Sequence, residues 1–225
     1  MIISTIILGT KKIKIYSFLF LIFIFSSCAN IVAPSGGPQD KTPPKLIKSQ
    51  PERNQSNFSG KEIILNFDEY IVLKDIANQL FISPPFENKP EVKVKGKALH
   101  IELKEDLIPN TTYIFNFGDA IADLHEGNPL TNFELVFSTG NSLDSMSYYG
   151  RVIDAFTSEP EKDALVMLYK KNYDSVPFLE KPLYISKTDS KGYFAFSNIE
   201  NVPYKIVAIN DINKNLKYNQ YVEKI

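Results

Sequence analysis

The sequence contains no tryptophan, a single cysteine and two histidines among its 225 residues. One cysteine excludes an internal disulfide, and without cysteine partners His100 and His125 lack the usual composition of a zinc site. Acidic and basic residues nearly balance at 26 and 25, so the chain lacks the basic excess typical of nucleic-acid binding. We therefore expect no disulfide, no cofactor and no nucleic-acid partner.

Long apolar runs are also scarce, and the one present lies near the N-terminus at residues 15–25, after Lys11, Lys12 and Lys14. It is too short to span a bilayer, which takes about 20 residues. Its length suits the hydrophobic segment of a secretion signal. We therefore predict that residues 1–27 are a signal peptide, whose removal takes away three lysines and no acidic residue.

Cys28 directly follows this run and is preceded by Ser26 and Ser27. Small residues before a cysteine resemble a lipobox, the site where bacteria attach diacylglycerol to the thiol and cleave the chain before it. Phe25 stands where such boxes usually carry leucine, so an ordinary signal peptide with an unrelated cysteine is the alternative. We interpret residues 28–43, which are rich in proline and glycine, as a lipidated cysteine and a flexible tether.

Residues 44–140 alternate short apolar segments with turn residues, at the spacing of an all-β sandwich. The period of two predicts strands at 61–67, 80–83, 112–117 and 133–138, and a hairpin at 92–103 that turns at Gly96. Residues 71–80 have room for one short turn of helix. Aromatic rings at alternate positions are predicted to fill the core: Phe67, Tyr113, Phe115, Phe117, Phe137, Phe194 and Phe196.

Landmarks in this region follow a recognisable order: Asp40-Lys41-Thr42-Pro43-Pro44, Ile64-Leu65-Asn66-Phe67-Asp68-Glu69, Pro109-Asn110-Thr111-Thr112-Tyr113 and Phe137-Ser138-Thr139-Gly140. In order and spacing they resemble the bacterial Ig-like domain of the surface-layer SbsA type. The resemblance implies a spacer or module of an envelope protein, and it implies no catalytic site.

Residues 147–225 carry a different pattern, with apolar segments at 164–169 and 202–208. Between them, the run from Thr188 to Phe194 suits a tight turn into a strand, in which Asp189 can accept backbone amides and Gly192 can adopt positive φ. This resembles the prealbumin-like sandwich of carboxypeptidase regulatory and Cna-B type modules. We therefore predict an all-β protein with two consecutive β-sandwich domains, at 44–140 and 147–225. The second domain is either truncated or closed by a strand at 218–225.

Two loops have the oxygen-rich composition of cation sites. Asp211, Asn213 and Asn215 imitate the start of a calcium loop, although Leu216 replaces the usual glycine and Val222 the usual glutamate. A second loop holds three acidic residues, Asp119, Asp123 and Glu126. For both loops the alternative is a solvated polar loop, and we predict no metal site while retaining the first three residues as calcium candidates.

The sequence has no recognised catalytic motif such as Gly-x-Ser-x-Gly or His-Glu-x-x-His. Asp68 and Glu69 are adjacent, so a continuing strand would place them on opposite faces, which is wrong for a glycosidase pair. We therefore expect no enzyme activity. Tyr148-Tyr149 and the pair Tyr218 and Tyr221 are candidates for exposed contact surfaces.

Together these features resemble a Bacteroidetes-type envelope lipoprotein. The prediction is a non-catalytic structural or binding module, attached to the outer membrane by its lipid, that contacts an envelope protein or a glycan. Residues 29–32 lack an acidic cluster of the kind that resembles a surface-export signal. This favours the periplasmic face of the outer membrane but does not determine which face the lipid occupies. Two alternatives are the accessory N-terminal part of a longer envelope protein and a calcium-dependent carbohydrate-binding module.

The lipid anchor makes a direct prediction. In cells fed a clickable fatty acid, the wild-type protein should carry label on an N-terminal Cys28, and Cys28→Ala should carry none. N-terminal mass spectrometry measures both. An unlabelled wild-type chain, cleaved at another position, would contradict the lipoprotein interpretation.

Overall fold

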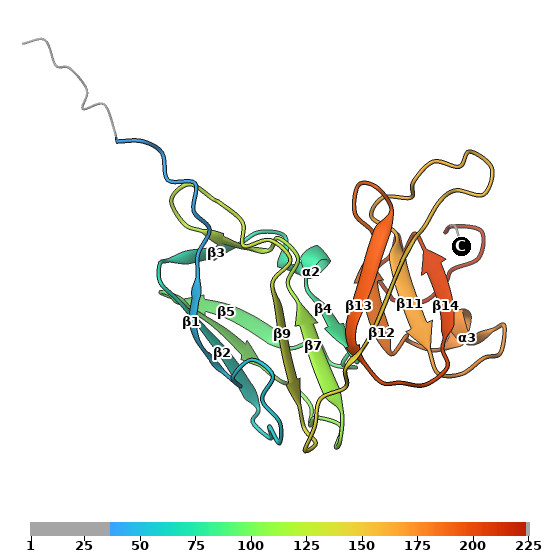
Figure 1. The fold of residues 1–225 in the computed structure, drawn as a ribbon, viewed down its shortest axis with the longest axis horizontal. Helices are drawn as coiled ribbons and strands as arrows, with labels where there is room; N and C mark the ends of the chain where they lie inside the picture. Colours follow the sequence, from blue (N-terminus) through green and yellow to red (C-terminus); the bar gives the residue numbers. More distant parts are fainter. Residues whose placement is uncertain (1–36, 224–225) are drawn as a thin grey trace, which may run out of the picture. The chain divides into compact units, whose positions relative to one another are not determined.

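The computed structural model describes residues 37–223, and those from Asp40 onward form one compact unit. The predicted signal peptide, Cys28 and the tether up to residue 36 lie outside the described residues. The architecture is almost entirely antiparallel β-sheet, as predicted (Figure 1). Across residues 37–223, no helix is long and apolar enough to cross a membrane.

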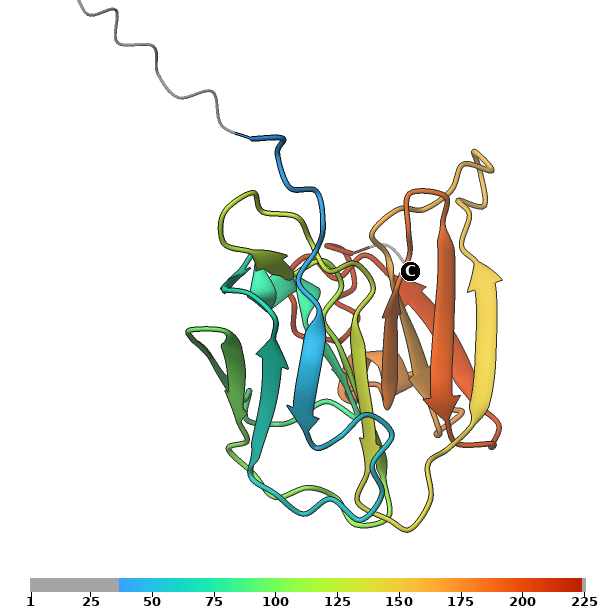
Figure 2. The same cartoon turned by 60° about the vertical axis from the view of Figure 1, so that its left-hand side comes forward.

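The first half of the unit contains two antiparallel sheets (Figures 1 and 2). The four-stranded sheet has the order β1 (Leu46–Gln50), β2 (Glu62–Phe67), β6 (Ala98–Glu102), β5 (Glu91–Lys95). The three-stranded sheet has the order β4 (Phe81–Ser83), β7 (Thr112–Asn116), β9 (Glu134–Ser138). Two short strands pair with each other, β3 (Ile71–Leu73) and β8 (Ile121–Asp123), and α2 spans Ile76–Gln79.

The strands predicted for this half are confirmed as β2, β4, β7 and β9, and the predicted hairpin is β5 and β6. The hairpin turns at Gly96, whose φ of +65° suits glycine. Residues 71–80 contain the expected turn of helix in α2, but they begin with β3, which the prediction missed. Three residues are too few to establish a periodicity.

A core of aromatic and aliphatic side chains lies between the two sheets. The rings predicted to be buried in this half, Phe67, Tyr113, Phe115, Phe117 and Phe137, are all buried. Tyr113 stacks on Phe86 and on Phe137, with 5.6 Å between centroids in each pair. Its hydroxyl accepts a hydrogen bond from the backbone N–H of Ile108 at 2.9 Å, so the buried ring has a partner for its polar end.

The second half contains a two-stranded sheet of β10 (Met146–Arg151) and β13 (Tyr193–Ile199), and a three-stranded sheet in the order β12 (Tyr184–Lys187), β11 (Leu165–Tyr169), β14 (Lys205–Ile209). A single helical turn, α3, spans Val176–Leu179. The predicted closing strand at 218–225 is wrong for residues 218–223, which contain a turn at 220–222 and no strand, and residues 224–225 lie outside the described part. Tyr221 has positive φ in this turn, which interrupts an extended chain.

Strand β11 is buried on both faces, and each face belongs to a different core. Val166 and Leu168 face a core that includes Phe194 and Phe196, the two other rings predicted to be buried. Leu165 and Met167 face a core that Phe81 of β4 also contacts. The second half therefore shares apolar packing with the first.

One link between the halves is a pair of side chains on the outer face of the three-stranded sheet. Ile114 of β7 and Val136 of β9 are directly opposite in the strand register, and both pack into the core around Val166. The backbone N–H of Ile185 in β12 also donates to Ser83 Oγ of β4 at 3.1 Å. Apolar burial and a buried hydrogen bond thus join the halves.

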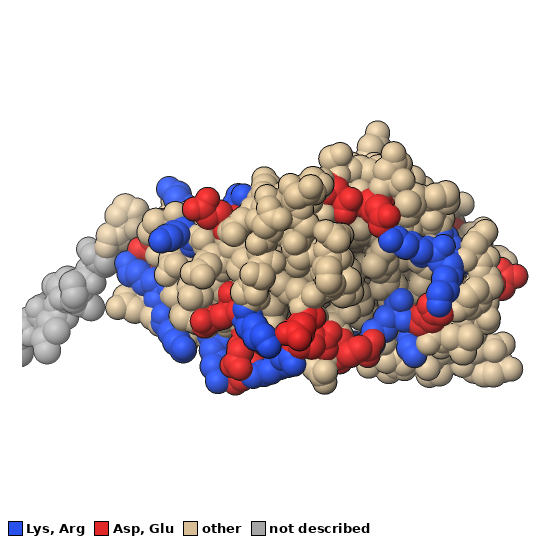
Figure 3. Space-filling model, turned by 90° about the horizontal axis from the view of Figure 1, so that it is seen from below, with Lys and Arg blue, Asp and Glu red and all other residues tan. Residues whose placement is uncertain are grey.

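Charged side chains of both signs lie interspersed on the face that Figure 3 shows. Lys104 Nζ contacts Glu102 Oε1 at 2.9 Å and Glu91 Oε2 at 3.0 Å. Strand β5 ends its sheet, and it carries Lys93 and Lys95 as exposed residues. Charges on an edge strand discourage pairing with another chain.

The loop after β8 is closed by a buried carboxylate. Asp123 accepts hydrogen bonds from the backbone N–H groups of Glu126, Gly127 and Asn128 at 2.7–3.0 Å. Burial alone would raise the pKa of Asp123, but these N–H donors outweigh it and lower that pKa to about 2. Asn128 Nδ2 in turn donates to the carbonyl of Asp40 at 3.0 Å, so the loop holds the chain that enters β1.

Truncating Ile114 tests the packing between the halves. Ile114→Ala removes a buried side chain, and we expect it to lower the free energy of unfolding by about 2–5 kcal/mol in urea titration. The matched control is Ile108→Ala, because Ile108 is exposed and its truncation should change stability by less than about 0.5 kcal/mol. Equal effects of the two variants would contradict the packing role.

Asp123→Asn tests the carboxylate. A depressed pKa means that the ionised group stabilises the fold above its ordinary pKa, and that this contribution is lost as pH falls from about 4 to about 2. The melting temperature of the wild type should therefore fall over this interval, and that of Asp123→Asn should start lower and fall less. Parallel curves for the two proteins would show that Asp123 does not carry the pH dependence.

Candidate functional site

The outer face of the β10–β13 sheet gathers exposed aromatic side chains. Tyr149 is opposite Ala195 in the register and Arg151 is opposite Tyr193, so these four residues share one face. Tyr149 is 82% exposed and Tyr193 is 53% exposed. Two large rings and an arginine on one face of a paired strand make this the candidate contact surface. We call Tyr149, Arg151 and Tyr193 the aromatic face.

The inner side of the same sheet explains why these rings point outward. Phe194 and Phe196 alternate with the exposed residues of β13 and are buried in the core. Gly150 lies opposite Phe194, and a Cβ at Gly150 would come within 2.7 Å of the Phe194 ring. Glycine at this position therefore lets the inner ring approach β10 closely.

Arg151 has a fixed position between the strand and the neighbouring turn. Its guanidinium carbon lies 5.4 Å from the centroid of the Tyr193 ring, within the range of a cation–π contact. Its Nε donates to the carbonyl of Lys191 at 2.9 Å. The cation is thus held over one ring of the aromatic face.

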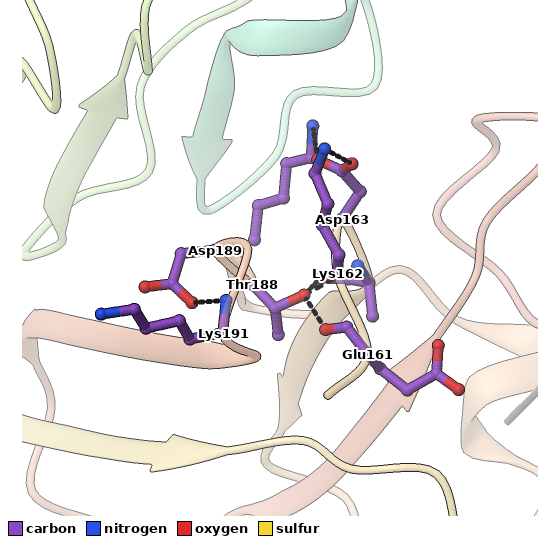
Figure 4. Close-up of polar contacts among 8 residues, drawn as sticks. Glu161, Lys162, Asp163, Thr188, Asp189 and Lys191 are labelled. Carbon is purple, nitrogen blue, oxygen red and sulfur yellow. Dashed lines mark hydrogen bonds and ion pairs between the residues drawn. The ribbon is translucent and has the colours of Figure 1, made fainter. Parts of the chain in front are cut away.

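The turn before β13, in which Asp189 bonds to Lys191 (Figure 4), leads directly into Tyr193. Asp189 Oδ1 accepts the backbone N–H groups of Lys191 at 2.8 Å and of Tyr193 at 2.9 Å, and Gly192 has a φ of +79°. Both roles were predicted and are confirmed. A Cβ at Gly192 would lie 2.4 Å from the carbonyl oxygen of Val152, so only glycine fits this turn.

Thr188 fixes the other side of the turn (Figure 4). Its buried hydroxyl donates to the carbonyl of Glu161 at 2.7 Å and accepts the backbone N–H of Ala164 at 2.9 Å. The segment that leads into β11 is thereby held against the segment that leads into β13. The aromatic face stands on a turn in which the buried polar groups are paired.

A loop beside β10 adds another exposed ring. Asp154 Oδ1 accepts the backbone N–H groups of Phe156 at 2.7 Å and Thr157 at 2.8 Å, which makes a tight turn at the tip. Phe156 is 96% exposed. Among the described strands, β10 pairs with β13 alone, so its other edge carries no strand partner there.

The calcium candidates occupy a self-bonded loop. Asp211 accepts the backbone N–H groups of Asn215 at 3.3 Å and Leu216 at 2.9 Å, and Asn213 Oδ1 also accepts that of Asn215. Glu223, which no motif in the sequence marks, also belongs to this loop: it is buried and accepts the backbone N–H groups of Ile212 and Asn219. Within residues 37–223, no group of three or more His, Cys, Asp or Glu is placed to hold a metal ion.

The other predicted candidates are dispersed. His100 Nδ1 lies 2.7 Å from Glu62 Oε1 across β6 and β2, whereas His125 lies in the loop that Asp123 closes. Asp68 accepts the backbone N–H of Lys45, where β2 has already ended. They lie on different elements and form no metal-binding group within residues 37–223.

The exposed tyrosines were predicted in part. Tyr148 and Tyr149 are exposed as proposed, and so is Tyr221. Tyr218 instead packs edge-on against Phe178, with 4.9 Å between ring centroids. The contact between Arg151 and Tyr193 was not predicted. The two residues are 42 positions apart, and the strand pairing that brings them together leaves no local pattern in the sequence.

The comparisons with known proteins support the first half of the fold. Residues 40–139 match the family model of the bacterial Ig-like domain, so this region is an Ig-like β-sandwich. Domains of this family are typical of cell-surface proteins. The search of curated proteins found no match.

Several solved structures are similar at low identity. PcoC, a methionine-rich copper resistance protein from Escherichia coli, is 20% identical over 43% of this chain and 97% of its own, with a TM-score of 0.31. The N-terminal part of the bacterial S-layer protein SbsC is 16% identical over 71% of this chain and 34% of its own, with a TM-score of 0.29. BcpA, the major pilin subunit of Bacillus cereus, is 16% identical over 73% of this chain and 58% of its own, with a TM-score of 0.23. These structural similarities are too low to indicate a function. The assignment of residues 40–139 to an Ig-like domain is based on the family model alone.

Proposed function

We propose that the protein is a non-catalytic envelope lipoprotein whose β-sandwich unit is a binding module. Three features support this: the apolar segment at residues 15–25 that we predict to be part of a signal peptide ending before Cys28, the match to the bacterial Ig-like domain, and the aromatic face. A lipid on Cys28 would hold the unit at the outer membrane, and the predicted tether, which the sequence places between Cys28 and residue 43, would connect the two. The described unit would then present its aromatic face to a partner in the envelope.

The aromatic face is the observation that carries the binding role. Tyrosine and arginine are enriched at the centres of protein interfaces, where they account for much of the binding energy. Tyr149, Arg151 and Tyr193 lie on paired strands, so little conformational entropy is lost when a partner orders them. The unpaired edge of β10 adds backbone groups that an extended segment can bond. These features favour a protein partner, with a glycan as the second possibility.

Site-specific photocrosslinking tests the binding role in the native envelope. A photoreactive residue in place of Tyr149 should give a discrete crosslinked product, and one in place of Ile47, which is exposed on β1, should not give that product. Mass spectrometry of the product distinguishes a protein from a glycan. The same products from both positions would contradict a specific role for the aromatic face.

Truncation of the face supplies the energetic test. Once the partner is identified, Tyr193→Ala should weaken binding by about 2 kcal/mol, or roughly 30-fold, since the change removes an interface ring and the support of Arg151. Tyr70→Ala is the matched control, because Tyr70 is a similarly exposed tyrosine in the first half. Calorimetry should show that Tyr70→Ala binds the partner with wild-type affinity. If both variants lost the same amount of affinity, the aromatic face would not be part of the interface.

A further inference from the structure

A cleft of about 500 Å³ lies between the two halves of the unit. One wall comes from the first half and includes Phe81, Ile82 and Phe86, and the other comes from the second half and includes Leu165, Ile185 and Leu216. The volume falls within the range of small-molecule sites, and such sites are mostly apolar with a few polar groups. The cleft is therefore large enough for a ligand with an apolar body.

The acidic residues that line the cleft already have partners. Asp163 Oδ1 lies 2.9 Å from Lys187 Nζ, and its other oxygen lies 3.5 Å from Lys162 Nζ. Asp211 accepts two backbone N–H groups of its own loop. The lining carboxylates are thus neutralised or hydrogen-bonded by protein groups.

Two lysines that line the cleft have no such partners. Lys89 comes from the segment between β4 and β5, and Lys214 comes from the loop after β14. Within residues 37–223, the ammonium group of neither lysine takes part in a hydrogen bond or an ion pair. Two free ammonium groups, one from each half, therefore flank an apolar space. A ligand that complements the two lysines carries a negative charge, and a ligand that complements the apolar walls has a hydrocarbon body.

We propose that this cleft binds an amphipathic anion, with its hydrocarbon body between Phe81 and Leu165 and its charged head near Lys89 and Lys214. A medium-chain fatty acid has this chemistry. None of the residues of the aromatic face lines the cleft, so this site is separate from the one in the proposed binding role. Because both halves line the cleft, an occupant would contact both.

Photoaffinity labelling of the full-length protein tests the proposal, with a diazirine derivative of dodecanoic acid as the probe. Label should map to peptides that contain residues 76–92 and 211–216, and excess unlabelled dodecanoate should compete for it. The double variant Lys89→Gln/Lys214→Gln should lower labelling of these peptides at least tenfold. Lys95→Gln is the matched control, because Lys95 is an exposed lysine outside the cleft, and it should leave labelling unchanged.

Two further measurements make the test decisive. A diazirine derivative of dodecanol, which has the same body and no charge, should label the cleft peptides much less than the acid. Ala77→Trp, which places a large ring in the lining, should abolish labelling with a melting temperature close to that of the wild type. Absent or scattered label, equal labelling by acid and alcohol, or full labelling of the lysine double variant would overturn the proposal.

Discussion

The packing of Ile114 and Val136 against the second half is the contact on which the rest of the structure depends. A sheet of three short strands has one face on its own core, and its other face would expose these two side chains to water. Covering that face takes these two side chains out of water and joins the halves through the core around Val166. Small sandwiches bury a low fraction of their surface, so sharing a face contributes stability that each would lack alone. Phe81, which packs against the core on the other face of β11, also lines the cleft.

The aromatic face depends on the same interior by a different route. Phe194 and Phe196 fill the core from inside, and the alternation of the strand then forces Tyr193 and Ala195 outward. The bonds of Asp189 and Thr188 fix where β13 begins, so the register of the outward residues is set by buried polar groups. A surface built on such a support is preorganised, which lowers the entropy that binding costs.

Much of the fold could be predicted from local patterns in the sequence. Alternation located β2 and β9, and turn chemistry identified the roles of Gly96 and Gly192, because both signals depend on neighbouring residues. The apolar segment that forms β11 was recognised, but the two cores that its side chains enter were not predicted. A strand that is buried on both faces has no alternation to show which core each side chain joins. The fold class was predictable, whereas the packing between the halves was not.

The candidate sites show the same division. Tyr149 was predicted as exposed from its place in a tyrosine pair, but its neighbours on the face come from β13, which is distant in the sequence. Glu223 escaped notice because the calcium pattern directs attention to the preceding position, Val222. Nothing in the sequence distinguishes Lys89 and Lys214 from other lysines, because lysine is usually exposed. Their position beside the apolar walls of the cleft is visible only in the structure.

The contact of Asn128 with Asp40 has a mechanical consequence. The chain runs from this contact into β1, roughly along the axis of that strand (Figure 2). A tension applied at residue 40 would therefore load the β1–β2 hydrogen bonds side by side, in shear, and would not open them one after another. Bonds loaded together share the force, so the first strand is placed to resist pulling from the N-terminal side.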